Sequence, residues 1–130
     1  MEGLHMKFNQ SAEDYLETIL VLSEKLPVVR SVDIATEMSF SKPSVSHAMK
    51  NLRNQNHITV TDAGFIYLTE SGRKIAESVY ERHLFFKNAL IKLGVTEKVA
   101  EDDACNIEHV ISAETFEAIK KYVTERENKK

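Results

Sequence analysis

Apolar residues recur every three or four positions along most of the chain, which is the period of an amphipathic α-helix. The first such stretch is expected from about Ala12 to Lys25. Ser11 begins a Ser-Ala-Glu-Asp sequence typical of a capping box, and Pro27 prevents further helix. The apolar stripe consists of Tyr15, Leu16, Ile19, Leu22 and Leu26. The pattern therefore predicts one long helix near the N-terminus, packed along a single face.

Two shorter helices are predicted next, at Ser31–Met38 and from after Ser41 to about Asn54. Pro43 falls in the first turn of the second helix, where its missing N–H group is harmless. Two short helices joined by a tight turn are typical of a helix-turn-helix motif.

A β-hairpin is predicted after these helices. β-branched and aromatic residues in His57–Val60 and Phe65–Leu68 flank a Thr-Asp-Ala-Gly sequence that ends at Gly64. A helix-turn-helix followed by a hairpin is the winged-helix arrangement.

The remainder of the chain is predicted to be helical. A long helix should start after Thr69 and end at Gly94, and a fifth should run from about Thr96 to Ile111. Ser112 is expected to cap a sixth. The apolar stripe of the long helix contains Ile75, Val79, His83, Phe86, Leu90 and Leu93, and that of the sixth contains Phe116, Ile119, Tyr122 and Val123. The expected fold is mainly α with a small β-hairpin wing, divided into a winged helix-turn-helix over residues 1–70 and a helical domain over residues 71–130.

Composition is that of a soluble globular protein, with 42% hydrophobic and 28% charged residues among 130. No apolar run approaches the roughly 20 residues of a membrane span, and the N-terminus has no signal-peptide core. The single cysteine, Cys105, cannot form an internal disulfide framework. These features predict a cytoplasmic protein without membrane association.

The formal net charge of −3 argues by itself against a nucleic-acid-binding protein, because phosphate contacts need a basic surface. The charge is segregated, however. Residues 38–61 contain no Asp or Glu and carry Lys42, His47, Lys50, Arg53 and His57. Residues 97–108 carry Glu97, Glu101, Asp102, Asp103 and Glu108 against Lys98 alone. This asymmetry predicts one region that faces phosphate and another that holds a cation.

The second helix of the helix-turn-helix is the candidate recognition helix, because its N-terminal residues would reach base edges in the major groove. Its candidate DNA-binding side chains are Lys42, Ser44, Ser46, His47 and Lys50. Hydroxyl and imidazole groups suit bases, whereas lysines suit phosphates. The alternative is an exposed polar helix in a winged-helix module that binds protein.

Three predicted helices carry groups that bind metals. Cys105, Glu108 and His109 have the i, i+3, i+4 spacing of one helix face. Asp14 and Glu17 lie one turn apart, and His83 interrupts an apolar stripe. Each has an ordinary structural interpretation: a helix cap for Asp14, a solvated charge for Glu17, a hydrogen-bonded core histidine for His83. Together they favour a cation site, since buried acids without basic partners are costly.

The chain resembles the diphtheria toxin repressor / manganese transport regulator family of metal-dependent repressors. The resemblance extends from about Ser11 to Val123 and is carried by residues 13–17, 41–47, 80–83 and 107–109. It implies a winged helix that binds double-stranded palindromic operator DNA, and C-terminal helices that bind metal and form a homodimer, so that metal-uptake genes are repressed. The implied metal ligands are Asp14, Glu17, His83, Cys105, Glu108 and His109. The implied recognition positions are Lys42, Pro43, Ser44, Ser46 and His47.

The sequence mixes features of the two branches of this family. Asp14 is typical of the manganese branch, whereas Cys105 is typical of the iron branch. Lys87 and Glu101 depart from the Glu and His expected at an iron-type ancillary site. Because the sequence ends soon after the sixth helix, we expect the short, two-domain manganese-type form. We therefore expect Mn(II), with Fe(II) as the alternative and Co(II) or Zn(II) as substitutes.

Two other functions are consistent with the residues alone. The chain could be a metal-independent winged-helix regulator with a solvated acidic patch. It could also be an enzyme with Cys105 as nucleophile and His109 or His83 as base. We expect no enzyme, because Cys105 and His109 share a helix face with acids and the sequence contains no Gly-rich oxyanion loop.

Overall fold

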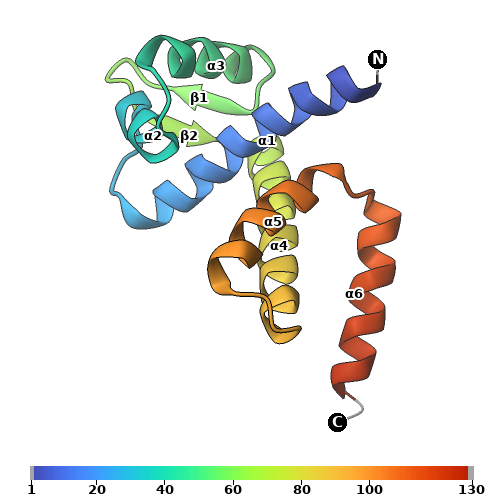
Figure 1. Ribbon diagram of the computed structural model, residues 1–130. Coiled ribbons are helices and arrows are strands. Elements are labelled where there is room, and N and C mark those ends of the chain that lie inside the picture. The colour runs from blue at the N-terminus through green and yellow to red at the C-terminus, as the bar shows by residue number, and fades with distance from the viewer. Residues whose placement is uncertain (1, 129–130) are drawn as a thin grey trace. The chain divides into compact units, whose positions relative to one another are not determined.

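The computed structural model describes the backbone of residues 2–128 and the side chains of residues 11–128. Over this range the chain forms six helices and one two-stranded antiparallel sheet (Figure 1). It divides into two compact units, Met1–Val79 and Tyr80–Lys130. The domain boundary was expected between residues 70 and 71, at the start of α4 (Glu70–Lys92). The two units divide later in this helix, between Val79 and Tyr80.

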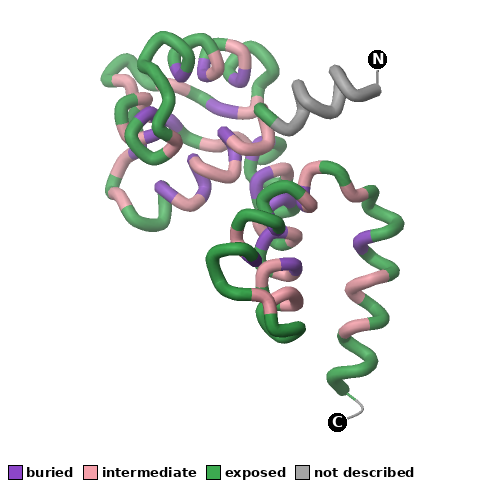
Figure 2. The backbone as a smooth tube through the Cα atoms, in the orientation of Figure 1, coloured by how far each residue is buried: buried purple, intermediate pink, exposed green. Residues whose placement is uncertain are grey.

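The first unit is a winged helix. Its elements are α1 (Glu2–Lys25), α2 (Ser31–Met38), α3 (Lys42–Asn54), β1 (Ile58–Val60), β2 (Ile66–Leu68) and the start of α4. Each element places apolar side chains in a common core, seen as the buried positions of Figure 2. The core includes Leu16, Ile19, Ile34, Val45, Met49, Leu52, Ile58 and Ile66. Each such side chain contributes about 1.5–3 kcal/mol on burial, so this core holds α3 in place.

Local sequence explains the helix-turn-helix and the wing. Ser39 adopts a left-handed conformation (φ 59°) that ends α2, and Ser41 caps α3 by accepting a hydrogen bond from the backbone N–H of Ser44 at 3.3 Å. In the hairpin, Thr59 pairs with Tyr67. Gly64 has φ +85°, which allows the turn. The predicted helix-turn-helix and hairpin are confirmed.

Two features of the first unit were not expected. α1 begins at Glu2, so Ser11 lies inside the helix and the predicted capping box there is wrong. The residues before Ser11 include Met6, Lys7 and Gln10, which are good helix formers, and no proline interrupts them. In addition, Val29 forms a β-bridge with Ile66, which pairs the segment after α1 with the hairpin.

Gly72 marks a close approach between the start of α4 and the hairpin. A Cβ atom there would lie 1.9 Å from the carbonyl oxygen of His57. The same junction is held by the Thr69 hydroxyl, which donates to the Asn56 carbonyl at 2.7 Å and accepts from the Gly72 N–H at 3.2 Å. Thr69 is therefore the N-cap of α4, as its sequence predicts.

The second unit consists of the rest of α4, α5 (Glu97–Val110) and α6 (Ala113–Asn128). Gly94 has φ +103° beyond the end of α4, and Ser112 caps α6 by accepting from the Thr115 N–H at 3.1 Å. The core is small and aromatic: the rings of Phe85 and Phe116 meet edge to face at 5.5 Å. Ala104 of α5 is buried in the same cluster as Phe86 of α4, so this core packs α5 against α4. Among the described residues, no helix is long and apolar enough to cross a membrane.

Candidate metal centre and recognition helix

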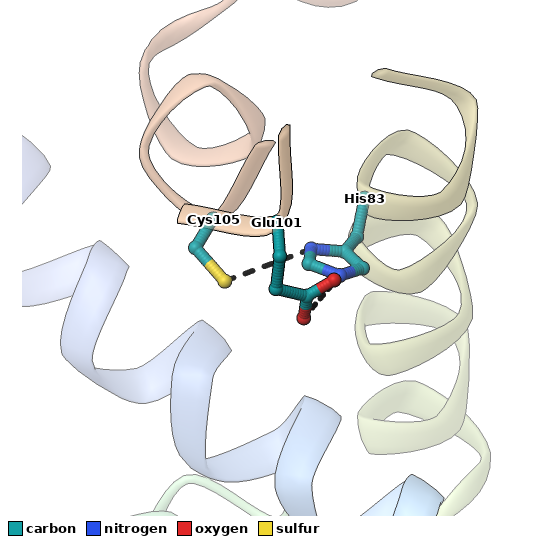
Figure 3. A group of neighbouring side chains, drawn as sticks. All are labelled: His83, Glu101 and Cys105. Atoms are coloured by element: carbon teal, nitrogen blue, oxygen red, sulfur yellow. Dashed lines mark hydrogen bonds and ion pairs between the residues drawn. The ribbon is translucent and has the colours of Figure 1, made fainter. Parts of the chain in front are cut away.

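α4 and α5 bring together side chains that bind transition metals. His83 extends from α4, and Glu101 and Cys105 extend from α5 one turn apart. Figure 3 shows these three side chains pointing toward one another, and their ligand atoms lie within 4.8 Å of each other. α5 can present both residues because positions four apart share a helix face.

The two ring nitrogens of His83 contact different groups. Nδ1 donates to Glu108 Oε2 at 2.8 Å and lies 3.7 Å from Cys105 Sγ. Nε2 donates to Glu101 Oε1 at 3.0 Å. The His83 side chain is only 9% exposed, so these contacts are shielded from solvent. The predicted packed histidine is therefore a polar junction between α4 and α5.

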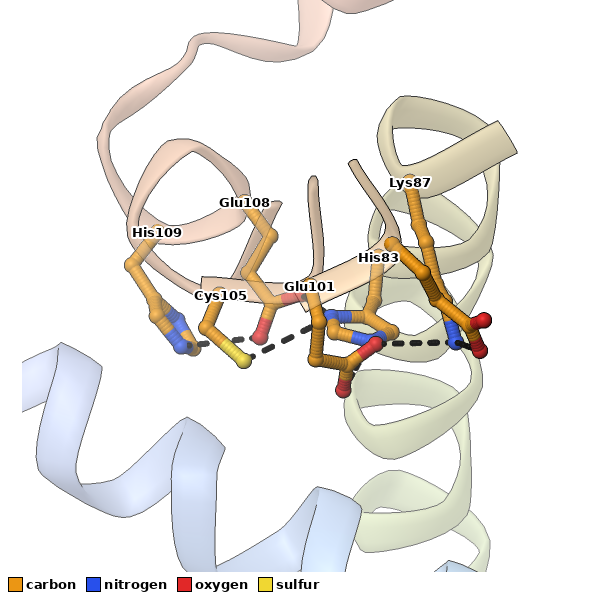
Figure 4. Close-up of polar contacts among 7 residues, drawn as sticks. His83, Lys87, Glu101, Cys105, Glu108 and His109 are labelled. Atoms are coloured by element: carbon orange, nitrogen blue, oxygen red, sulfur yellow. Dashed lines mark hydrogen bonds and ion pairs between the residues drawn. The ribbon is translucent and has the colours of Figure 1, made fainter. Parts of the chain in front are cut away.

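Glu108 is the most buried acid of the cluster. Its side chain is 0% exposed, and its second oxygen, Oε1, lies 3.1 Å from Nε2 of His109, whose side chain is 1% exposed. The carboxylate thus lies between two imidazoles (Figure 4). A buried carboxylate is costly unless a positive charge compensates it, so this position requires a cation or a protonated histidine.

The electrostatics of His83 show how that requirement is met. Hydrogen bonding to Cys105 and Glu108 raises the pKa of His83 to about 11, although burial opposes the shift. The imidazolium is therefore the positive charge among these acids. Imidazole, thiolate and carboxylate are all ligands of divalent transition metals, and the cluster fits such an ion if the ion displaces the His83 proton.

Lys87 and Glu101 form a second polar contact beside His83. Lys87 Nζ lies 3.1 Å from Glu101 Oε2 and 4.0 Å from Glu97 Oε1. The hydrogen bond with Glu101 raises the pKa of Lys87. Burial acts to raise the pKa of Glu101, but Lys87 and His83 outweigh it and lower that pKa. The sequence pattern does not predict this contact, although both residues lie one turn from an expected ligand.

The six expected metal ligands are divided between the two units. His83, Cys105, Glu108 and His109 come together in the second unit. Asp14 and Glu17 lie one turn apart on α1 of the first unit, where both are partly buried. The assignment of all six to one ion is a prediction from sequence.

The six expected DNA-binding side chains lie on α3, between its first residue, Lys42, and Lys50. Lys42, Pro43, Ser44, Ser46, His47 and Lys50 are all exposed. The intervening Val45 and Met49 are buried in the winged-helix core. One face of α3 therefore anchors the helix, and the other presents hydroxyls, an imidazole and ammonium groups to solvent.

Two features define the class of this protein as a metal-responsive DNA-binding regulator. One is a winged helix with an exposed, acid-free recognition helix, and the other is a helical unit with clustered metal-binding groups. Comparison with known proteins supports the same class. Residues 7–62 match the model described as iron dependent repressor, N-terminal DNA binding domain. Residues 69–129 match the model described as iron dependent repressor, metal binding and dimerisation domain. The chain belongs to this family of metal-dependent transcriptional repressors, which are not enzymes.

Individual relatives are transcriptional regulators, and two of the similar solved structures are manganese regulators. The chain is 34% identical over 108 residues to the transcriptional regulator MntR of Escherichia coli O6:H1, an alignment that covers 83% of this chain and 70% of that protein. The solved structure of the manganese regulator SloR has 30% identity and a TM-score of 0.77, with 87% of this chain and 53% of that one covered. A manganese-dependent transcriptional repressor in complex with manganese has 26% identity and a TM-score of 0.79, with 87% and 52% covered. The chain thus spans about half the length of these solved proteins.

Proposed function

We propose that this chain is a homodimeric repressor that binds a palindromic operator when it carries Mn(II), with Fe(II) as the alternative ion, and that it controls genes for metal uptake. The observation that carries the proposal is the cluster of His83, Cys105, Glu108 and His109, within the region that matches a metal-binding and dimerisation domain. This cluster belongs to a different unit from the recognition helix. Four of the six proposed ligands therefore lie in a different unit from the proposed DNA contacts.

The proposed ligand set combines both units. Asp14 and Glu17 on α1 supply hard carboxylates, and the second unit supplies His83, Cys105, Glu108 and His109. A bound ion provides the positive charge that lets these acids remain ionised in a buried place. Because the ligands come from both units, holding one ion restrains α1 relative to the dimerisation helices.

This restraint is the proposed link between metal and DNA. The two recognition helices of a two-fold dimer must lie roughly 34 Å apart to enter successive major grooves. The metal ion favours that arrangement only to the extent that it binds the protein more tightly in that arrangement than in others. In each copy, Ser44, Ser46 and His47 read base edges, while Lys42 and Lys50 contact phosphates. Pro43 pre-organises the first turn of α3.

Manganese is the proposed ion because five of the six proposed ligands are carboxylates or imidazoles, which suit it. Two of the similar solved structures are also manganese-responsive regulators. Cys105 adds a softer thiolate, which suits Fe(II) and allows Co(II) or Zn(II) to substitute.

The proposal is tested by operator affinity with and without metal. An operator is selected from random duplexes by the metal-loaded protein, and its affinity is measured by fluorescence anisotropy with Mn(II), Fe(II), Co(II), Zn(II) or chelator. We expect Mn(II) or Fe(II) to strengthen binding at least tenfold, about 1.4 kcal/mol. Equal affinity with metal and with chelator would show that the chain is a metal-independent regulator. His109→Ala should abolish the response, whereas Lys98→Gln, an exposed α5 residue, should not.

A further inference from the structure

The buried ring of His83 is held at both nitrogens by different acids. Nδ1 faces Glu108 Oε2 at 2.8 Å and Cys105 Sγ at 3.7 Å, both of them proposed ligands. Nε2 faces Glu101 Oε1 at 3.0 Å. With only 9% of the side chain exposed, no bulk solvent replaces these partners. The ring therefore has one side toward the proposed ion and one side toward Glu101.

Glu101 in turn is held by a positive charge. Its second oxygen, Oε2, lies 3.1 Å from Lys87 Nζ, and Glu97 lies 4.0 Å from the same ammonium group. Lys87 and His83 lie one turn apart on α4, and Glu97 and Glu101 lie one turn apart on α5. Figure 4 shows Lys87, Glu101 and His83 in contact one after another. Both oxygens of Glu101 therefore already contact protein side chains, Oε1 that of His83 and Oε2 that of Lys87.

We propose that Glu101 is a positioning residue of the metal centre: it accepts a hydrogen bond from the Nε2–H group of His83, so that Nδ1 is the nitrogen that binds the ion, and Lys87 retains Glu101 in this outer position. The inference rests on the proposed function, because it concerns how one of its ligands is oriented. A neutral imidazole carries one proton, and the hydrogen-bond partner of one nitrogen decides that the other is free to bind metal.

The alternative is that Glu101 itself binds the ion, since its carboxylate lies near both His83 and Cys105. Lys87 argues against this. To reach an ion as a ligand, Glu101 would have to give up its ion pair with Lys87 or its hydrogen bond with His83 Nε2. The geometry therefore favours an outer role for Glu101.

The orientation of His83 can be tested on the wild-type protein. The chain, labelled with nitrogen isotope in histidine, is loaded with isotope-labelled Cd(II) and studied by NMR. We expect the cadmium–nitrogen coupling of His83 to appear at Nδ1, and its remaining proton at Nε2. Coupling at Nε2 would overturn the inference while leaving the proposed function intact. If the protein takes up no ion, both the inference and the proposed function fail.

Substitution of Glu101 tests its contribution. Glu101→Ala removes the acceptor and should weaken metal affinity by about 10- to 100-fold, the usual effect of losing such an outer partner. Glu101→Gln keeps an acceptor oxygen without charge, so it should restore part of this loss. In both variants the number of ions bound per subunit should equal that of the wild type.

The matched control is Asp102→Asn, on the neighbouring α5 residue, whose carboxylate pairs with Lys98 at 3.9 Å and not with His83. Its affinity should equal that of the wild type. Equal losses in Asp102→Asn and Glu101→Gln would assign the effect to net charge and contradict a positioning role. An unchanged affinity in Glu101→Ala would contradict it as well.

Discussion

The sulfur of Cys105 lies among carboxylates and imidazoles. The side chain is exposed and lies 3.7 Å from His83 Nδ1, close enough that one ion could bind both. Soft thiolate favours Zn(II), Co(II) and Fe(II), whereas oxygen ligands favour Mn(II). A single side chain therefore bears on the metal preference of the whole centre.

Replacing this thiolate with a carboxylate should change the ranking of metals. We expect Cys105→Glu to raise affinity for Mn(II) relative to Zn(II) by about tenfold or more, or ~1.4 kcal/mol. Competition with a chromophoric chelator measures both affinities. Cys105→Ser, which removes the thiolate without adding charge, should weaken both ions. An unchanged ranking in Cys105→Glu would mean that Cys105 is not a ligand.

His83 makes metal binding depend on pH. Its pKa of about 11 means that His83 holds a second proton below that pH, and the ion must displace it. Metal affinity should therefore rise with pH, by up to about tenfold per pH unit for one released proton. Calorimetry in buffers of different ionisation enthalpy counts the protons. Binding with no net proton release near neutral pH would contradict a role for the His83 imidazole as ligand.

Gly72 is required by packing rather than by backbone conformation. A methyl group there would lie 1.9 Å from the backbone oxygen of His57, which directly precedes β1 and accepts a hydrogen bond from the Thr69 N–H at 3.1 Å. We expect Gly72→Ala to destabilise the protein by about 1–3 kcal/mol through overpacking. Thermal unfolding measures the loss, and Glu77→Ala, at an exposed position of the same helix, is the control. A melting temperature equal to that of the control would refute the close approach.

Among the elements, α3 is the one whose start matters most for function. Ser41 supplies its N-cap, and the exposed residues that follow are the proposed DNA contacts. The start of α6 is built in the same way, since Ser112 accepts from the Thr115 N–H at 3.1 Å. The two caps thus form a natural pair for comparison, one in each unit.

Loss of the α3 cap should weaken DNA binding. We expect Ser41→Ala to cost about 1 kcal/mol of stability and to speed amide hydrogen exchange in the first turn of α3. Operator affinity should fall because the recognition residues lose their fixed backbone. Ser112→Ala should cost similar stability and affect exchange only at the start of α6. Faster exchange at α3 in both variants would mean that the cap is not local.

For the whole molecule, a net charge of −3 coexists with an acid-free region at residues 38–61. That region is suited to phosphate, so the salt dependence of DNA binding should depend on its few basic residues. In a dimer, Lys50→Gln removes two contacts and should lower the slope of log affinity against log salt by about two. Lys98→Gln makes the same charge change on α5 and should leave the slope unchanged. Equal slopes for Lys50→Gln and the wild type would remove Lys50 from the interface.

Local sequence was sufficient for most elements of both units. The features that specify these elements act over a few residues, so the sequence pattern predicts them. They are the helical period, the caps Ser41, Thr69 and Ser112, and the glycines at positive φ, Gly64 and Gly94. The start of α1 was missed, because a Ser-x-x-Asp pattern caps a helix only where the preceding residues are not helical. The Val29–Ile66 bridge joins segments far apart in sequence, which no local pattern predicts.

The sequence by itself determined the class of protein: a winged helix with a basic recognition helix, and metal-binding residue types at one-turn spacing. What only the tertiary structure decided is how those groups meet. The packing of α5 on α4 directs His83 Nδ1 toward Cys105 and Glu108, and Nε2 toward Glu101, which Lys87 holds. Spacing specifies which residues share a helix face, whereas the partner of each nitrogen depends on how two helices dock, through contacts between residues 18 or more apart.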